Sequence, residues 1–135
     1  MAVEQLLRTE QNGSLSFGNH ILADKAKLED YKYNGDLMKV KTYKAMTKLE
    51  KNGLFAYESV PGTSVYNFIE TENGVDFEVE GAEDAQITVG LEEDAQYEVI
   101  VNGSSAGVMA TNMGGKLSFN VELGAAPATI SIKKA

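Results

Sequence analysis

Five residues in the first half of the chain are the best candidates for binding another molecule. Tyr31 and Tyr33 alternate along one predicted strand, and Lys39, Lys41 and Tyr43 alternate along the next. Aromatic rings stack on sugar faces and ammonium groups attract carboxylates, so this set could hold an anionic glycan. The same residues also suit a simpler role, as half-buried core tyrosines and as lysines that keep a strand edge from pairing.

No set of residues forms a recognisable catalytic or metal-binding motif. Glu78 and Glu80 share the outward face of a predicted strand, which indicates a solvated acidic face and not the facing carboxylates of a glycosidase. His20 is the only histidine, and the chain has neither a Gly-x-Ser-x-Gly turn nor a phosphate-binding glycine loop. The acidic turns at 83–84 and 92–94 lack the spacing of a calcium loop. We therefore predict no catalytic residues, no metal and no cofactor, and lean away from an enzyme.

Length and composition set the outer bounds. The chain has 135 residues and no cysteine, so disulfides, thiolate zinc sites and cysteine nucleophiles are excluded. The first residues, Met-Ala-Val-Glu-Gln, lack the basic and apolar regions of a signal peptide, and no apolar stretch approaches the roughly 18 residues that span a bilayer. We expect a soluble cytoplasmic protein without a membrane partner.

Charge divides the chain unevenly. Residues 1–67 carry nine Lys/Arg and eight Asp/Glu, whereas residues 68–135 carry three Lys and twelve Asp/Glu, which together give the net charge of −8. This acidic balance disfavours nucleic acid as a partner. The break lies near Val60-Pro-Gly-Thr-Ser64, so we predict two regions, residues 1–62 and 63–135. The lysine-rich half of one subunit could dock on the acidic half of another, which would make the protein a homo-oligomer.

Five Asn-Gly dipeptides, at positions 12, 34, 52, 73 and 102, predict a chain of β-hairpins, because both residues tolerate the positive φ of a type I′ turn. After residue 62, apolar residues alternate with polar ones in about seven short segments, as in Val75, Phe77 and Val79. The prediction is an all-β fold, with a seven-stranded β-sandwich at 63–135 preceded by a smaller antiparallel β region at 1–62.

Two segments leave strand and helix both open. Tyr43–Lys51 contains helix-forming residues, but a helix of this length is marginal and the following Asn-Gly suits a hairpin, so strand is favoured. Val3–Arg8 has the same ambiguity.

Three segments carry a resemblance to a known group of proteins: Glu10–Asn19, Phe55–Thr63 and Gly114–Phe119. They resemble short bacterial proteins of about this length that bear the label endosialidase, and the resemblance covers nearly the whole chain. It implies a carbohydrate-active protein but brings no catalytic motif onto positions of this chain. Separately, residues 66–135 resemble the immunoglobulin-like sandwich modules appended to carbohydrate-active enzymes.

The endosialidase label conflicts with the chemistry of this sequence. Enzymes that act on sialic acid usually clamp its carboxylate with several arginines, because the guanidinium fork binds carboxylate in a bidentate way. This chain has only Arg8, and sialidase propellers need a far longer chain. We therefore expect no endosialidase catalysis.

Two functions of different kinds remain. The preferred hypothesis is a non-catalytic β-protein that acts by binding or by self-assembly, and the alternative is a carbohydrate-binding or endosialidase-like protein. The tyrosines distinguish them. Exposed, coplanar rings of Tyr31, Tyr33 and Tyr43 beside a groove would favour a glycan, whereas rings packed inside would favour assembly.

Overall fold

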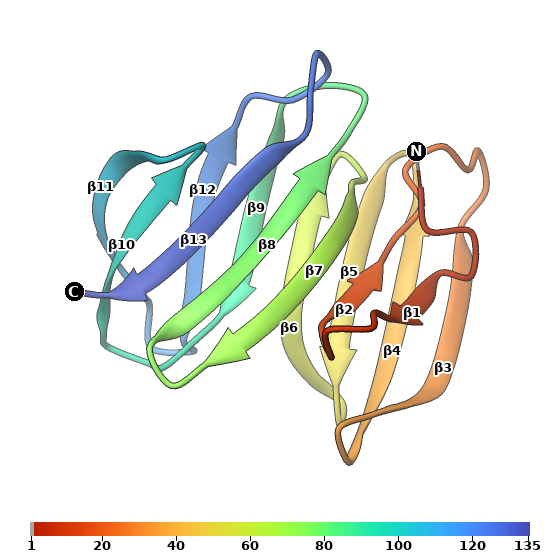
Figure 1. The fold of residues 1–135 in the computed structure, drawn as a ribbon, viewed down its shortest axis with the longest axis horizontal. Coiled ribbons are helices and arrows are strands. Elements are labelled where there is room, and N and C mark those ends of the chain that lie inside the picture. The colour runs from red at the N-terminus through yellow and green to blue at the C-terminus, as the bar shows by residue number, and fades with distance from the viewer. Residues whose placement is uncertain (1) are drawn as a thin grey trace.

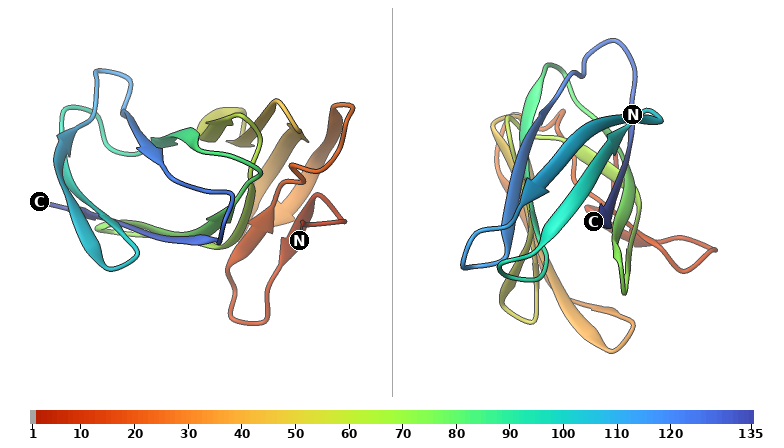
Figure 2. Two further views of the ribbon diagram at one scale, coloured as in Figure 1. Left: turned by 90° about the horizontal axis from the view of Figure 1, so that it is seen from above. Right: turned by 90° about the vertical axis from the view of Figure 1, so that its left-hand side faces the viewer.

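The computed structural model describes residues 2–135, which form thirteen β-strands and no helix. The strands make two antiparallel sheets that lie one over the other. A seven-stranded sheet, called sheet A, lies in front of a six-stranded sheet, called sheet B, in Figure 1, and Figure 2 shows the two layers from above. The prediction of an all-β, hairpin-rich fold is confirmed.

Each sheet contains strands from both ends of the chain. In spatial order, sheet A consists of β1 (Leu7–Thr9), β2 (Leu15–Phe17), β7 (Ser64–Thr71), β8 (Gly74–Glu80), β13 (Ala128–Lys134), β10 (Gln96–Val101) and β11 (Ser104–Ala110). Sheet B consists of β12 (Lys116–Val121), β9 (Ala85–Gly90), β6 (Leu54–Val60), β5 (Met46–Lys51), β4 (Asp36–Tyr43) and β3 (Ala26–Tyr33). Seven strands, β7 to β13, lie within residues 63–135. The β2–β7 and β6–β9 ladders both cross the predicted boundary at residue 62.

The Asn-Gly dipeptides connect paired strands at all five positions, but only three form two-residue turns with positive φ at both residues. These are Asn34-Gly35, Asn52-Gly53 and Asn102-Gly103, with φ of 49° and 84°, 53° and 79°, and 51° and 83°. At position 73 the turn residues are Glu72 and Asn73, and Gly74 already belongs to β8. A Cβ on Gly74 would lie 1.8 Å from the carbonyl oxygen of Ile132, so this glycine permits a close backbone approach.

The apolar alternation predicted for the second half is confirmed. Val75, Phe77 and Val79 are buried in β8, while Asp76 and Glu78 between them are exposed. The segment for which helix and strand were both open, Tyr43–Lys51, is extended: it ends β4 and forms β5. Val3–Arg8 leads into β1 and contains no helix.

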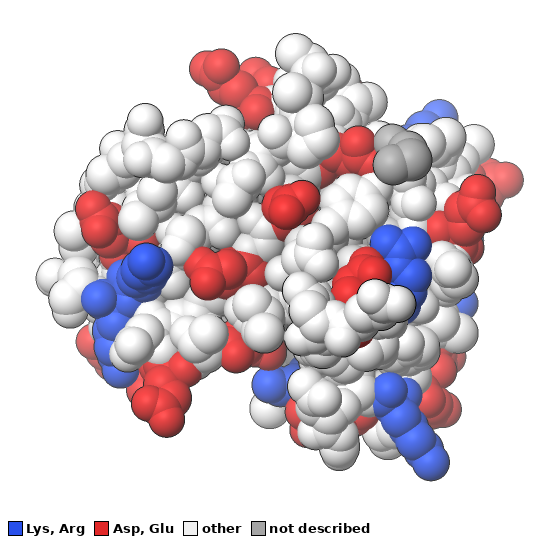
Figure 3. All heavy atoms as spheres, in the orientation of Figure 1, with Lys and Arg blue, Asp and Glu red and all other residues white. Residues whose placement is uncertain are grey.

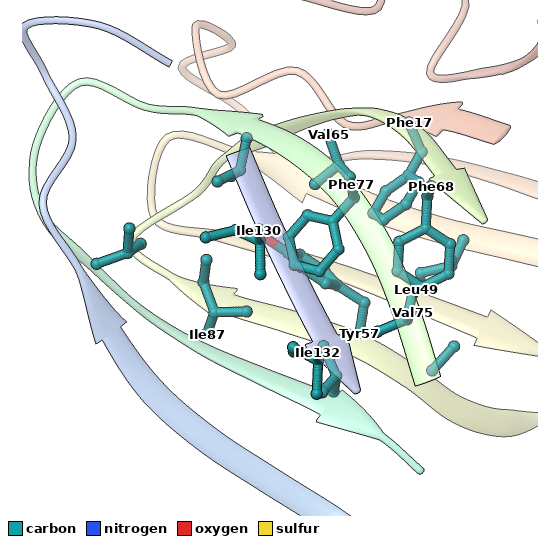
Figure 4. Close-up of a cluster of buried hydrophobic side chains, with 14 of the residues drawn as sticks. Phe17, Leu49, Tyr57, Val65, Phe68, Val75, Phe77, Ile87, Ile130 and Ile132 are labelled. Atoms are coloured by element: carbon teal, nitrogen blue, oxygen red, sulfur yellow. The ribbon is translucent and has the colours of Figure 1, made fainter. Parts of the chain in front are cut away.

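Aromatic rings from both sheets meet in the middle of the core (Figure 4). Tyr57 of sheet B contacts Phe17 and Phe77 of sheet A edge to face, with ring centroids 5.2 and 5.7 Å apart. Phe17 also meets Phe68 at 5.5 Å. Pairs of this geometry contribute about 0.5–1.5 kcal/mol each beyond their buried area. The rings therefore hold the two sheets together at this point.

Beside these rings lies a buried hydroxyl network, which we call the central crossing: Thr42, Thr47, Tyr57, Ser59 and Thr63. It sits where the chain passes from β6 to β7. The Thr63 hydroxyl lies 2.8 Å from the Tyr57 hydroxyl and 2.7 Å from that of Ser59. Among residues 2–135, no buried side-chain polar atom lacks a hydrogen-bond partner. The hydroxyls of this cluster can therefore be buried because each of them is hydrogen-bonded.

Candidate functional surfaces

The five predicted ligand residues divide between the two faces of sheet B. Tyr31 and Tyr33 are half-buried and face the interior, where they pack against the core. The Tyr31 hydroxyl lies 2.9 Å from that of Thr9, and the Tyr33 hydroxyl donates to the carbonyl oxygen of Gly13 at 2.6 Å. Both tyrosines thus tie β3 to the β1–β2 hairpin.

A β-bulge explains this inward orientation. Leu28 is opposite Val40 in the β3–β4 register, but Tyr31 is opposite Met38, so β3 contains one extra residue. Asp30 within the bulge has a positive φ of 57°. An extra residue reverses the alternation of a strand, and Tyr31 and Tyr33 consequently leave the face on which Lys27 lies.

Lys39, Lys41 and Tyr43 remain together on the outer face of sheet B. Their neighbours Met38, Val40 and Thr42 on β4 are buried, which fixes the orientation of the strand. The Tyr43 ring has the Lys25 ammonium 5.6 Å from its centroid, and Lys39 lies 4.0 Å from the carboxylate of Glu50. The predicted set is therefore reduced to three residues on one surface.

Lysines gather in a row on this outer face. Lys27 is opposite Lys41, and Lys41 is opposite Lys48, so three lysines stand side by side on β3, β4 and β5. Neighbouring strands are about 4.8 Å apart, and like charges placed directly opposite each other are destabilising. We call Lys27, Lys39, Lys41 and Lys48 the lysine face.

Carboxylates neutralise part of the lysine face. Lys27 forms an ion pair with Glu29 at 3.1 Å, and Lys48 has Glu58 opposite it on β6. The hydrogen bond from Lys27, with Lys39 and Lys41 nearby, lowers the pKa of the Glu29 carboxyl. Within residues 2–135, Lys41 and Lys48 form no ion pair. Their ammonium groups can accept an external anion.

On the outer face of sheet A, acidic side chains gather in the middle, with basic side chains on either side of them (Figure 3). Asp76, Glu78 and Glu80 alternate along β8 with its buried residues and form a ridge of carboxylates. Next to this ridge is an open hollow of about 340 Å³. Its lining is Arg8, Glu10, Tyr66, Asn67, Glu78, Glu80 and Pro127, and we call it the acidic hollow.

Arg8, the only arginine of the chain, is already paired at the rim of this hollow. Its Nε and Nη2 atoms donate to one carboxylate oxygen of Glu10, at 3.0 and 2.9 Å. Ser16 donates to the same oxygen, and these hydrogen bonds from Ser16 and Arg8 lower the pKa of the Glu10 carboxyl. The guanidinium is therefore engaged within the chain and is not presented as a clamp for a ligand carboxylate.

A serine–histidine contact was not predicted from the sequence. Nδ1 of His20 lies 2.7 Å from Oγ of Ser64, a distance typical of a nucleophile and its base. Ser64 has 0% exposure, however, so its oxygen cannot reach a substrate. Burial lowers the pKa of His20, which favours the neutral ring. The two residues are far apart in sequence and carry no local signal of their contact.

The most accessible backbone belongs to β11, the last strand of sheet A. Its one neighbour within residues 2–135 is β10, so its other edge presents free N–H and C=O groups. All of its residues are exposed except the half-buried Met109, and Val108 is 57% exposed. Between Glu98 and Lys116 the chain has no charged residue. That uncharged run was the sequence signal for this edge.

Within residues 2–135, no three His, Asp or Glu side chains gather closely enough to hold a metal ion. No helix in the described part of the chain is long and apolar enough to cross a membrane.

Comparisons with known proteins do not place the chain in a family. Protein-family models, curated proteins and solved structures were all searched, and none of them matches.

Proposed function

We propose that this chain is a non-catalytic β-protein that works by assembling with copies of itself through β11. The observation that carries the proposal is the uncharged, exposed edge of this strand. Natural sheets usually protect a long edge with charges, proline, a β-bulge or a covering segment. β11 has one bulge, at Ala106, but it has no charged residue or proline, and within residues 2–135 no strand covers it.

The strand that best fits this edge is β11 of a second copy of the chain. The chain carries a net charge of −8, so two copies repel each other over most of their surfaces. The uncharged run that contains β11 is where this repulsion is weakest. Antiparallel pairing of β11 with β11 gives a two-fold contact that continues sheet A from one copy into the next.

The placement of the tyrosines supports assembly over glycan binding. The carbohydrate alternative needed Tyr31, Tyr33 and Tyr43 on one platform. Tyr31 and Tyr33 lie inside with their hydroxyls bonded, while Tyr43 lies on the opposite face. The likeness of residues 63–135 to an immunoglobulin-like module and the cytoplasmic location remain part of this proposal.

The test uses two variants of the edge and a matched control. Val108→Glu and Val108→Lys each place like charges together in a two-fold contact, so each should be monomeric. Val60 is 55% exposed, against 57% for Val108, but its backbone pairs with Gln86 in the interior of sheet B. Val60→Glu should therefore associate like the unmodified chain.

Mass would be measured by light scattering after size exclusion. We expect a discrete oligomer above 14.6 kDa for the unmodified chain, monomers for each Val108 variant, and restored association when the Glu and Lys variants are mixed. Because the contact itself is uncharged, added salt should preserve or strengthen it by screening the net charge. A monomer at all concentrations, or an oligomer that survives both Val108 variants, would overturn the proposal.

A further inference from the structure

The lysine face and the acidic hollow lie on opposite sides of the molecule, one outside sheet B and the other outside sheet A. Lys41 and Lys48 form no ion pair within residues 2–135, although they stand directly opposite each other. Neither surface can reach the other within one chain. Any neutralisation of one by the other has to occur between molecules.

The acidic hollow has the size and chemistry to receive a lysine side chain. Its volume is about 340 Å³, and its lining includes the carboxylates of Glu10, Glu78 and Glu80. The guanidinium of Arg8 is bonded to Glu10 and the Tyr66 hydroxyl donates to Glu80, so Glu78 is the carboxylate that an incoming lysine would meet. The ring of Tyr66 also lines the hollow, and an ammonium group can lie against such a ring.

We infer that the lysine face of one copy docks on the acidic hollow of the next, with Lys41 and Lys48 as the contacting groups. The two surfaces differ, so the contact is head-to-tail and each molecule can take part in two contacts. The result is a stack in which sheet B of one copy covers sheet A of its neighbour.

This stacking deepens the proposed self-assembly but does not depend on β11. The β11 edge lies at the side of sheet A, whereas stacking uses the faces of the two sheets. The two contacts also respond to salt in opposite ways. Screening reduces self-repulsion at the uncharged edge but removes the attraction between lysines and carboxylates.

The experiment is carried out in the Val108→Glu chain, in which edge pairing is blocked. Light scattering would follow mass against concentration at low and at high salt. We expect mass to rise with concentration at low salt and to fall to that of a monomer at high salt. Adding Lys41→Glu and Lys48→Glu together should lower the association constant at least tenfold.

A matched control changes the net charge by the same amount. Lys44 and Lys116 are exposed; Lys44 lies in the turn between β4 and β5, and Lys116 lies on β12, at the edge of sheet B away from the lysine face. Lys44→Glu with Lys116→Glu changes the net charge by as much as the Lys41/Lys48 pair, so it should retain most of the stacking. Equal losses in both double variants would overturn the inference, because net charge alone would then explain them.

A charge exchange tests the partner surface. Glu78→Lys should also abolish stacking, and mixing it with the Lys41→Glu/Lys48→Glu chain should restore an alternating stack. If mass is independent of salt, and the Lys41/Lys48 variant instead loses binding to polygalacturonate, the occupant of the lysine face is an acidic polysaccharide and the inference is wrong.

If stacking persists but the original chain shows no edge dimer, the β11 proposal fails alone.

Discussion

The central crossing and β11 are both built from uncharged residues but differ in burial and in hydrogen bonding. At the crossing, Tyr57 and Thr63 are fully buried and their hydroxyls bond each other. In β11, Ser104 to Val108 are exposed, and within residues 2–135 no strand pairs with the outer edge. The difference teaches that stability and association are located in separate parts of this molecule. Each can then be changed without the other.

The largest effect on folding should come from the aromatic core. Phe77→Ala removes a ring that is 2% exposed and contacts Tyr57, and it should lower the free energy of unfolding by about 3–5 kcal/mol. Urea unfolding measures this. Phe55→Ala, at a half-buried ring under Lys116 on the outer face, should cost less. Equal losses at the two positions would contradict the location of the core.

A smaller loss is expected at the hydroxyl network. Thr63→Val keeps the shape of the side chain but removes the oxygen that the hydroxyls of Tyr57 and Ser59 both contact. Leaving buried hydroxyls without that partner should cost about 1–3 kcal/mol. Thr129→Val, on the exposed face of β13, is the control and should change stability by less than about 0.5 kcal/mol.

The partial burial of His20 predicts a pH dependence of stability near the central crossing. Burial lowers the folded-state pKa of His20 below its ordinary value of 6.5, with partial opposition from Glu80. The unfolded chain therefore binds more protons between the two pKa values. The contribution of His20 to stability should be fully present above about pH 6.5 and should decrease as the pH falls below it. His20→Gln cannot titrate, so denaturation midpoints of that variant should lose this slope; an unchanged slope would assign it to other groups.

The smallest effect on folding is expected at the edge. Val108→Glu should change the free energy of unfolding by less than about 0.5 kcal/mol, because Val108 is 57% exposed and lies opposite Glu98 of β10. Urea unfolding at concentrations where the chain is monomeric measures this. A loss of several kcal/mol would show that β11 is part of the stabilising core, and the separation of the two regions would fail.

Local sequence patterns predicted much of the fold. The Asn-Gly turns marked connections between paired strands at all five positions, because turn geometry depends on residues next to each other. Alternation in β8 predicted which side chains are buried, for the same reason. Such local patterns do not specify the order of the strands across a sheet. Nothing in the sequence places β13 between β8 and β10, since those contacts join distant segments.

The candidate site was predicted less well, and the bulge in β3 is the physical reason. With regular alternation, Tyr31 and Tyr33 would share the outer face with Lys27 and Lys41. One inserted residue near Asp30 turned them inward. The sequence around Asp30 looks like that of a regular strand, so it gives no signal of the bulge. The edge of β11 could have been found, since it lies in the longest run without charge, residues 99–115.

The position of β13 has a mechanical consequence. β10 and β11 join the rest of sheet A only through β13, which lies between β10 and β8. Within sheet A, tension applied to β11 by a bound neighbour passes through the five register pairs of the β10–β13 ladder, while the backbone also carries it into β9 and β12 of sheet B. Pulled sideways, such a ladder opens pair by pair, so an assembly under load would strain this ladder first, and its opening would expose the buried side chains of Tyr97 and Val99.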